Sequence, residues 1–355
     1  MRIDLIGPVP PPLGGVSVHL LRLAERLTAL GQDVRRHGPQ QRSLHFAYHA
    51  SLARAIRGAD VVHVHTHGMR DLVLLSFTGR IHHHMLWTAH GDVVRSQFDN
   101  LPTFGKSIVR NALQTLAAVV AVNGQVAQDL LDVGVGYSRI HVISPFIPPV
   151  ESERNQPALP NVEMFCRRHY PVVCAAAFTL ADDGSVPLYG IDLAVEAIAG
   201  LCRRFANAGL IVHIATLQHD DWLRLGQLKE RCRKLGIEDN VLFLLDSVPF
   251  GPTLNRSQIL LRPTATDGDA VTVREALHVG IPVVASDVVS RPEGTTLFRH
   301  RDVDDFTAKL VCVAENRQQH VPRPQPDATG PLLDLYRRIA HQRFDVRPRV
   351  TNGLK

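Results

Sequence analysis

The sequence predicts an α/β protein with two doubly wound, Rossmann-like domains that face each other across a cleft. The chain has 355 residues, which is too long for one ordinary core and suits two domains of about 150 to 180 residues. Hydrophobic residues make up 45% of the chain and charged residues 21%, as in a globular protein. Short apolar runs alternate with segments of helical periodicity in two successive halves, and this alternation is typical of parallel sheets covered by helices.

The composition argues against several classes of protein. No run of eighteen apolar residues occurs, and the N-terminus resembles a charge-interrupted strand followed by prolines rather than a signal peptide. We therefore expect a soluble, cytoplasmic protein. The net charge of +5 argues against binding along a nucleic acid, but it permits peripheral contact with the anionic inner face of a membrane.

The cysteines favour neither a disulfide framework nor a zinc site. Their number is odd, and no two of them form a C-x-x-C pair. We expect all five to be thiols of the core: Cys166, Cys174, Cys202, Cys232 and Cys312.

The N-terminal segment has the order strand, glycine turn and helix. Residues 3–7 form an apolar strand, and the segment after Gly15 carries apolar residues at helical spacing. Gly14 and Gly15 follow the first strand, where a Rossmann-like domain binds its ligand and where glycine lets the backbone approach a bulky group. A glycine pair after prolines is also common as a simple turn. Further expected elements of this half are strands at 59–68, 85–90, 118–123 and 140–145 and helices at 106–117 and 124–133.

Histidines alternate in the strand predicted at residues 59–68. His63, His65 and His67 would share one face of that strand. We do not expect a metal site here, because no carboxylate or cysteine accompanies the three in a known ligand pattern. The triplet His82-His83-His84 is interpreted as a polar loop.

His90 has a different setting. It ends the apolar strand that begins at Met85 and precedes Gly91, at the place where an α/β sheet exposes its ligand-binding residues. We therefore expect His90 to contact the substrate.

A proline-rich stretch at residues 145–153 is typical of an interdomain linker. It places the domains at residues 1–150 and 151–330, followed by a C-terminal segment at 331–355 with one helix and a basic tail. The second half is expected to contain strands at 171–178, 210–215, 241–245 and 283–286 and helices at 189–198, 222–235 and 301–310.

The stretch from Arg262 to Pro292 carries the main candidates. It places Asp267 and Glu275 eight residues apart, with Gly268 after the first acid and a helix start between them. The amides of a helix start can bind a phosphate, and two acids a little over two turns apart can meet the hydroxyls at two ends of a long ligand. A nucleotide-sugar fits this spacing. Taken alone, the stretch is more typical of an ordinary capped helix, with Asp267 as a solvated loop acid and Glu275 on the exposed face of the helix.

The same stretch resembles retaining glycosyltransferases of family 4, which have the GT-B fold and the motif P-x-x-x-E-G-F-G-x-x-x-x-E-A. Asp267-x7-Glu275 is a variant of that motif, and the turn from Thr88 to Gly91 resembles the family's T-x-H turn. The resemblance implies that Asp267 and His90 contact the transferred sugar and that Glu275 binds the ribose. It assigns the donor diphosphate to the backbone of Gly268, Asp269, Ala270, Val271 and Thr272 and implies a donor contact for Gly14 and Gly15.

One family feature is missing. The family has Gly-Arg after the first strand of the second domain and then Lys-Gly, whereas this chain has Ala177-Phe178-Thr179 and Tyr189-Gly190, with no lysine or arginine from His169 through Cys202. Either other cations replace them, or the protein is a non-catalytic GT-B partner or scaffold that has lost tight diphosphate binding. An epimerase of the same architecture fits the two motifs less well. The candidate replacements are Arg262, Arg274 and Arg291.

The resemblance implies an enzyme of the hexosyltransferase type. It would move a sugar from a nucleotide-sugar to a glycan or lipid-linked acceptor with retention of configuration, in bacterial-type synthesis of a cell-surface polysaccharide or glycoconjugate. The donor phosphate would help to deprotonate the acceptor. We expect no cofactor and no metal, although Asp267-Gly268-Asp269 spells a D-x-D sequence, because both acids are assigned to donor contacts.

Overall fold

A computed structural model describes residues 1–10, 14–38, 56, 58–65, 84–91, 93–245, 248–316 and 321–345. The chain divides into two compact units. Unit 1 comprises Met1–Val9, Val16–Ile147 and Pro326–Lys355, and unit 2 comprises Pro10–Gly15 and Pro148–Gln325. The change of unit after Ile147 lies within the stretch interpreted as a linker, and the chain returns to unit 1 at Pro326.

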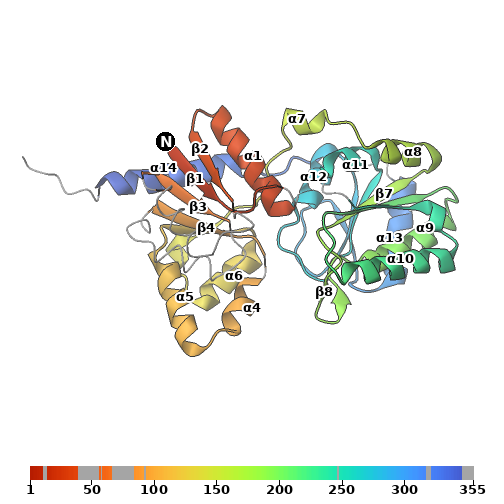
Figure 1. The fold of residues 1–355 in the computed structure, drawn as a ribbon, viewed down its shortest axis with the longest axis horizontal. Helices are drawn as coiled ribbons and strands as arrows, with labels where there is room; N and C mark the ends of the chain where they lie inside the picture. Colours follow the sequence, from red (N-terminus) through yellow and green to blue (C-terminus); the bar gives the residue numbers. More distant parts are fainter. Residues whose placement is uncertain are drawn as a thin grey trace, which may run out of the picture. The chain divides into compact units, whose positions relative to one another are not determined.

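The sheet of unit 1 has six parallel strands in the order β2-β1-β3-β4-β5-β6 (Figure 1). Ile3 of β1, the strand next to the edge strand β2, pairs with Val34 on one side and with Val61 on the other. The strands are β1 (Arg2–Ile6), β2 (Asp33–His37), β3 (Val61–Val64), β4 (Met85–Ala89), β5 (Ala118–Ala121) and β6 (Ile140–Val142).

Helices cover both faces of this sheet. Ile3 and Leu5 alternate with residues of the opposite face and pack with Leu23 of α1, as the two-residue period of a strand requires. The other face packs against α4, α5 and α6. The unit 1 helices that enclose these cores are α1 (Gly15–Ala29), α4 (Val93–Asp99), α5 (Thr103–Thr115), α6 (Gly124–Val133) and α14 (Thr329–Asp345).

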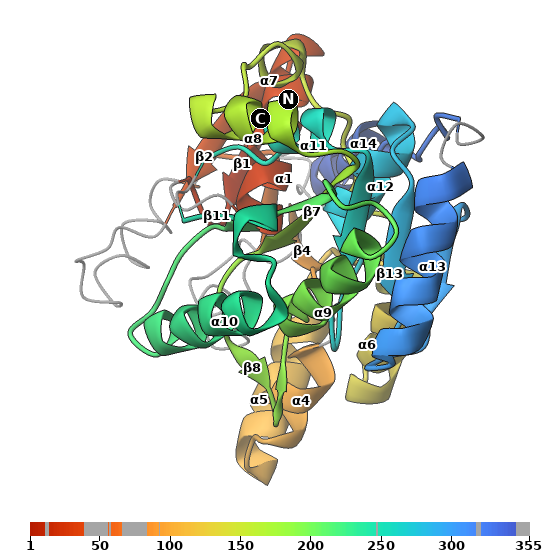
Figure 2. The ribbon, with the colours of Figure 1, turned by 90° about the vertical axis from the view of Figure 1, so that its right-hand side faces the viewer.

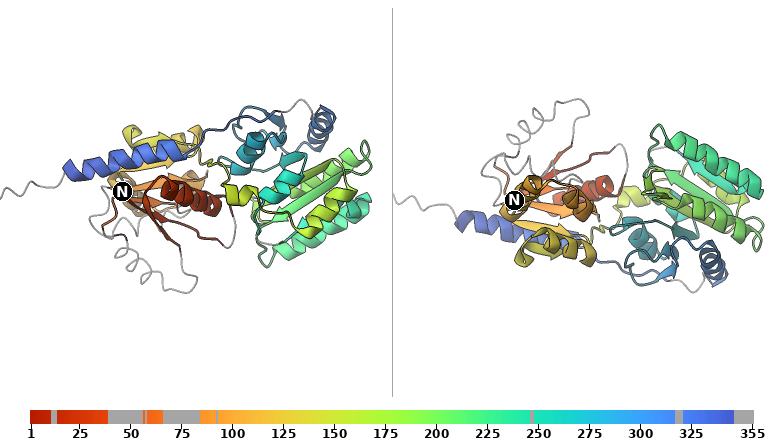
Figure 3. Two further views of the ribbon diagram at one scale, coloured as in Figure 1. Left: turned by 90° about the horizontal axis from the view of Figure 1, so that it is seen from above. Right: turned by 90° about the horizontal axis from the view of Figure 1, so that it is seen from below.

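Helix α14 is the last element of the chain but belongs to the core of unit 1. Leu332, Leu335 and Ile339 lie in the same buried cluster as strand β1. The backbone amide of Ala328 donates to the carbonyl of Phe146 over 2.8 Å just before the helix begins. Figure 3 shows α14 along the sheet of unit 1. The C-terminal segment therefore completes the first unit.

The sheet of unit 2 also has six parallel strands, in the order β11-β10-β7-β12-β13-β14. A small antiparallel hairpin, β8 (Asp182–Asp183) and β9 (Val186–Pro187), follows the first strand. The strands of the main sheet are β7 (Val172–Ala177), β10 (Gly209–Ile214), β11 (Val241–Leu244), β12 (Ile259–Arg262), β13 (Val283–Ser286) and β14 (Thr295–Phe298).

Two sets of helices enclose the sheet of unit 2. One face packs against α9 (Ile191–Cys202), α10 (Asp221–Leu235) and α13 (Val303–Asn316). The other face packs against α8 (Pro160–Arg168), α11 (Gly251–Arg256) and α12 (Val271–Val279). Figure 2 shows α8 and α11 on one side of β7 and α9 and α10 on the other. Both units are thus doubly wound, and the predicted fold class is confirmed.

Several local predictions need correction. The stretch interpreted as a linker ends in a short helix, α7 (Glu151–Arg154). Cys312 lies exposed on α13, so it is not a core thiol, whereas Cys174 and Cys232 are buried. His84 is buried directly before β4 rather than part of an exposed polar loop, while His67, His82 and His83 fall outside the described residues. In the part of the chain that the structure describes, no helix is both long and apolar enough to cross a membrane.

Candidate active site

The loop between β12 and α12 holds Asp267 between two arginines. Arg262, the last residue of β12, donates from Nε to Oδ2 over 2.9 Å and from Nη2 to Oδ1 over 3.0 Å. Arg291 donates from Nη1 to Oδ2 over 2.7 Å. The side chains of Asp267 and Arg291 are 8% and 2% exposed, so these are charge-assisted bonds in a largely dry setting. Two guanidinium groups and one carboxylate leave one positive charge in excess.

Arg291 is fixed by the ends of two neighbouring strands. Its Nη2 donates to the hydroxyl of Thr264 over 3.0 Å, and its Nε donates to the carbonyl of Ser286, the last residue of β13, over 3.3 Å. The Ser286 hydroxyl donates to the carbonyl of Thr264 over 2.7 Å. Because β12 and β13 are adjacent and parallel, their carboxyl ends place these groups together, at the edge where such sheets bind ligands.

The two arginines keep Asp267 ionised. Burial alone would raise the pKa of this carboxyl, but the charges and hydrogen bonds of Arg262 and Arg291 outweigh it and lower the pKa to about 2. A carboxylate held in this way accepts hydrogen bonds at neutral pH and cannot donate a proton.

The second acid of the loop is paired as well. Asp269 accepts from Nε of Arg274, with both carboxylate oxygens at 2.8 Å. Nη1 of Arg274 donates to Oε1 of Gln325 over 3.0 Å. Each of the three arginines proposed as diphosphate cations therefore bonds an acid of the Asp267-Gly268-Asp269 sequence.

Helix α12 begins without a side-chain cap. Its N-cap residue is Ala270, which offers no side-chain hydrogen bond, and no acid lies in the first turn, which begins with Val271 and Thr272. The amides of a first turn have no partner within the helix, and the helix dipole favours an anion there. Glu275 lies further along the same helix and is 6% exposed.

The turn before α9 packs against this loop. Tyr189 places its ring under the guanidinium of Arg262, with Cζ 5.5 Å from the ring centroid. Gly190 has φ of 60°, and a Cβ there would lie 1.9 Å from the carbonyl oxygen of Pro263. Only glycine permits this conformation and this approach. The amide of Ala265 donates to the carbonyl of Leu188 over 2.8 Å, which joins the two segments.

His90 of unit 1 lies directly after β4, as predicted, and contacts a second histidine. Its Nε2 lies 2.8 Å from Nδ1 of His65, the residue that follows β3. The ring of His19 on α1 lies 5.4 Å from that of His90. Gly14 and Gly15 lie at the start of α1, and a Cβ built on Gly15 would meet no described atom within 4 Å. His19 was not a candidate from the sequence, although a histidine within one turn of the glycine pair was a usable signal.

His63 plays a different part from His65. Its Nδ1 lies 2.6 Å from the hydroxyl of Tyr336 on α14, and its Nε2 lies 2.6 Å from the hydroxyl of Thr88. Both ring nitrogens are therefore used inside the core, and burial lowers the pKa of His63 well below its ordinary value. The rings of His63 and His65 are 3.9 Å apart, as expected for alternate residues of one strand.

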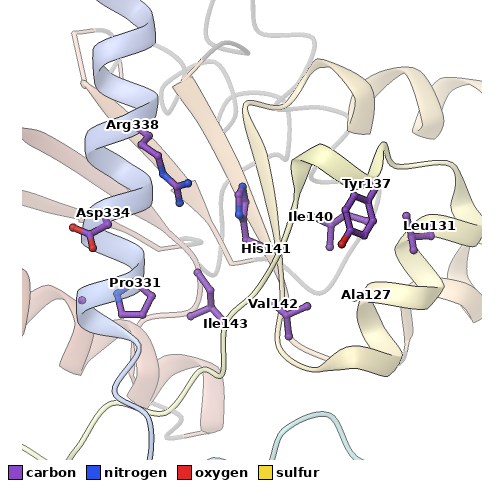
Figure 4. A pocket seen from close by; sticks show the side chains of 11 residues that line it. Ala127, Leu131, Tyr137, Ile140, His141, Val142, Ile143, Pro331, Asp334 and Arg338 are labelled. Carbon is purple, nitrogen blue, oxygen red and sulfur yellow. The ribbon is translucent and has the colours of Figure 1, made fainter.

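Unit 1 also contains a cavity of about 700 Å³ between β6, α6 and α14 (Figure 4). Tyr137 and Val142 line it and are strongly exposed, and Figure 4 shows Arg338 of α14 directed toward His141. None of the predicted site residues lines this cavity. It is therefore separate from the candidate site.

Comparison with known families assigns both halves of the chain. Residues 13–151 match the family model described as glycosyltransferase family 4, and residues 183–316 match the model described as glycosyl transferases group 1. No curated protein matches the sequence at a significant level. The chain is a glycosyltransferase. More narrowly, it consists of a family 4 domain followed by a group 1 domain.

Solved structures of similar fold are distant in sequence. HepE of Anabaena, in complex with UDP and glucose, shares 15% identity at a TM-score of 0.70, covering 98% of this chain and 100% of its own. WaaG, a glycosyltransferase involved in lipopolysaccharide biosynthesis, shares 14% at 0.60, covering 98% and 96%. Sucrose-phosphate synthase from Thermosynechococcus elongatus shares 16% at 0.60, covering 97% and 98%. These likenesses support the GT-B fold.

Proposed function

We propose that the protein is a retaining hexosyltransferase that moves a sugar from a nucleotide-sugar to a glycan or lipid-linked acceptor. The observation that carries this proposal is the arrangement around α12, where Asp267 and Glu275 flank an uncapped helix start next to two partly buried arginines, Arg262 and Arg291. Hydroxyl-binding acids on either side of an anion site suit a sugar, a diphosphate and a ribose in that order.

The donor in this proposal is a nucleoside diphosphate-sugar. Structures of the similar protein HepE contain UDP and UDP-glucose, which makes uridine nucleotides the first to test. Arg262 and Arg291 carry one charge more than Asp267 neutralises, and we assign that excess to the diphosphate. They would thereby replace the arginine and lysine that the sequence lacks after β7.

The remaining residues receive the roles that the resemblance implies. Asp267 orients the two arginines and contacts the transferred sugar, Glu275 accepts from the ribose hydroxyls, and His90 contacts the sugar. The amides of Gly268, Asp269 and the first turn of α12 bind the diphosphate. No metal ion or cofactor is assigned to this step, because guanidinium groups and helix amides supply the positive charge.

The acceptor and the location follow from the same proposal. A glycan or lipid-linked acceptor of a cell-surface polysaccharide would be met in the cytoplasm or at the inner face of a membrane. The net charge of +5 suits contact with an anionic lipid surface. Binding to vesicles with and without anionic lipid tests this contact.

A thermal-shift screen with UDP, GDP, ADP and their sugars tests the central proposal. A nucleotide that binds only the folded protein raises the melting temperature as its concentration exceeds its dissociation constant. Incubation of the responding sugar nucleotide with acceptor glycans, followed by NMR of the anomeric proton, then tests transfer and retention.

A second function is favoured by one specific observation. All three candidate cations already bond Asp267 or Asp269 of the loop between β12 and α12. This pairing is expected if the protein is a non-catalytic partner whose diphosphate site has closed. No response to any nucleotide in the screen would support this function over transfer.

A further inference from the structure

Three histidines of unit 1 converge from separate elements. His19 comes from α1, His65 follows β3 and His90 follows β4. Each offers a ring nitrogen, and the three nitrogens lie within 4.8 Å of one another. The ring of His19 lies 5.2 Å from that of His65, and the latter lies 5.1 Å from that of His90. His65 is fully buried and His19 is 3% exposed, so the cluster is built into the unit rather than scattered on its surface.

His19 presents a lone pair to the cluster. Its Nδ1 lies 2.7 Å from the carbonyl oxygen of Pro145, and because a carbonyl can only accept, Nδ1 carries the hydrogen. The other nitrogen, Nε2, is buried and has no hydrogen-bond partner among the described residues. A buried polar atom without a partner is costly. A histidine whose outer nitrogen donates to a carbonyl while its inner nitrogen remains bare is the arrangement found in metal ligands.

We propose that His19, His65 and His90 bind a divalent transition-metal ion of the Zn²⁺ class. The cluster has three imidazole nitrogens and no carboxylate. Imidazole ligands suit Zn²⁺, Cu²⁺ and Ni²⁺, whereas Mg²⁺, Ca²⁺ and Mn²⁺ prefer oxygen. Three protein ligands leave the fourth position of a tetrahedral ion to water or another small ligand.

Small side-chain rotations would bring the cluster to coordination geometry. Zn–N bonds of about 2.0–2.1 Å in a tetrahedron separate the nitrogens by roughly 3.4 Å. The His65–His90 pair, at 2.8 Å, must open slightly, and the His19 nitrogen, which lies within 4.8 Å of the other two, must come to roughly 3.4 Å from each. One hydrogen lies between His65 Nδ1 and His90 Nε2. Whichever of the two rings carries this hydrogen, it moves to the other nitrogen of the same ring. Both lone pairs then face the ion, and no proton is released.

The ion would interfere with the role that we propose for His90. If His90 contacts the transferred sugar, as the proposed function requires, bound Zn²⁺ holds its ring away from the sugar and should inhibit transfer until EDTA is added. This consequence rests on the proposed function, whereas binding of the ion does not.

Cobalt titration of the full chain tests the site without any assay of activity. Protein freed of metal by EDTA and then desalted should develop the visible ligand-field bands of four-coordinate Co²⁺, and one equivalent of Zn²⁺ should abolish them. His19→Gln, His65→Gln and His90→Gln should each weaken Co²⁺ binding about 100-fold, since even loss of an outer hydrogen-bonding partner of a ligand costs 10–100-fold. Melting curves without metal show whether each variant is folded.

Two controls address other histidines. The exposed His219 of unit 2 and the pair His82 and His83 should be replaceable by glutamine with no change in affinity. Loss of binding in the His82→Gln, His83→Gln variant would overturn the proposal. Wild-type affinity for Co²⁺ in the three cluster variants would overturn it as well. His90 is only half-buried, so its variant decides the question if the two buried positions do not fold. Binding of Zn²⁺ without inhibition would keep the metal site and reject the sugar contact of His90.

Discussion

The guanidinium of Arg262 lies over the ring of Tyr189, with Cζ 5.5 Å from the ring centroid. Tyr189 precedes Gly190, at the position where the family pattern has a lysine. The same arginine makes two hydrogen bonds to Asp267. The ring of Tyr189 thus occupies the position at which the family pattern has a lysine. It packs against a different cation, Arg262 at the end of β12.

Replacement of Tyr189 tests this substitution. Tyr189→Leu removes the ring face and should weaken binding of the responding nucleoside diphosphate by about 0.5–1 kcal/mol, the energy of a cation–π contact at a partly exposed site. Tyr189→Phe keeps the ring and should bind normally. Isothermal titration calorimetry of both variants distinguishes the ring from the hydroxyl, and an equal loss in both would assign the effect to the hydroxyl.

Arg291 should be a strong contributor to the stability of unit 2. Arg291→Gln removes buried bonds to Asp267 and Thr264, and we expect a loss of about 1.5–3 kcal/mol in the free energy of unfolding. Arg256→Gln is the matched control, because Arg256 pairs with Glu163 at the surface and should cost at most about 1 kcal/mol. Denaturant titrations followed by circular dichroism measure both, and similar values would contradict a special role for Arg291.

Replacement of Glu275 and replacement of Asp267 should affect different steps, nucleotide binding in the first case and turnover in the second. Glu275→Gln gives the ribose a poorer acceptor and should weaken binding of the nucleoside diphosphate by about 1–2 kcal/mol. Asp267→Asn removes a competitor for the arginines, so diphosphate affinity should not fall, whereas turnover should, because contact with the moving sugar matters most in the transition state. Calorimetry and steady-state rates separate the two effects. Equal affinity losses in both variants would show that the motif roles are assigned wrongly.

Because Asp267 is paired with two arginines, the free energy of unfolding should depend on pH in the acid range. Its pKa is lowered to about 2 in the folded protein, so the unfolded chain binds the proton first and stability falls between about pH 4 and pH 2. The contribution present at neutral pH is about 2 kcal/mol. Calorimetry of wild type and Asp267→Asn at pH 7 and pH 3 should show a difference that shrinks on acidification. The exposed Asp239 is the control, and Asp239→Asn should show no such trend.

Much of the fold could be predicted from apolar patterning alone. The buried strands β4, β5, β7 and β13 are continuous apolar runs, and each was found. Longer helices such as α5, α9 and α10 were found as well, whereas the short helices α4 and α11 were missed. Strand β2 was missed because it lies at the edge of its sheet and reads Asp-Val-Arg-Arg-His, with only half-buried or exposed residues. Helix α8 was missed because Val162 is its only buried residue.

The site was less predictable than the fold. The sequence pointed to Asp267, Glu275 and three arginines. It could not show that each arginine bonds Asp267 or Asp269 in the loop between β12 and α12. Arg291 reaches Asp267 only because β12 and β13 are neighbours in the sheet. His19 was missed since the periodicity of α1 was judged from its apolar residues, while the position of His19 against His65 depends on tertiary packing.

The membership of α14 in unit 1 has a consequence for the order in which the chain becomes stable during synthesis. Everything that unit 2 needs between Pro148 and Gln325 leaves the ribosome before the segment from Pro326 onward, so the later unit can complete its core first. Unit 1 cannot complete its core until α14 has been made. Until then, the apolar face that packs against Leu332 and Tyr336 is exposed to water. The half that is made first is therefore finished last, and its open apolar face is prone to aggregation until α14 has been made.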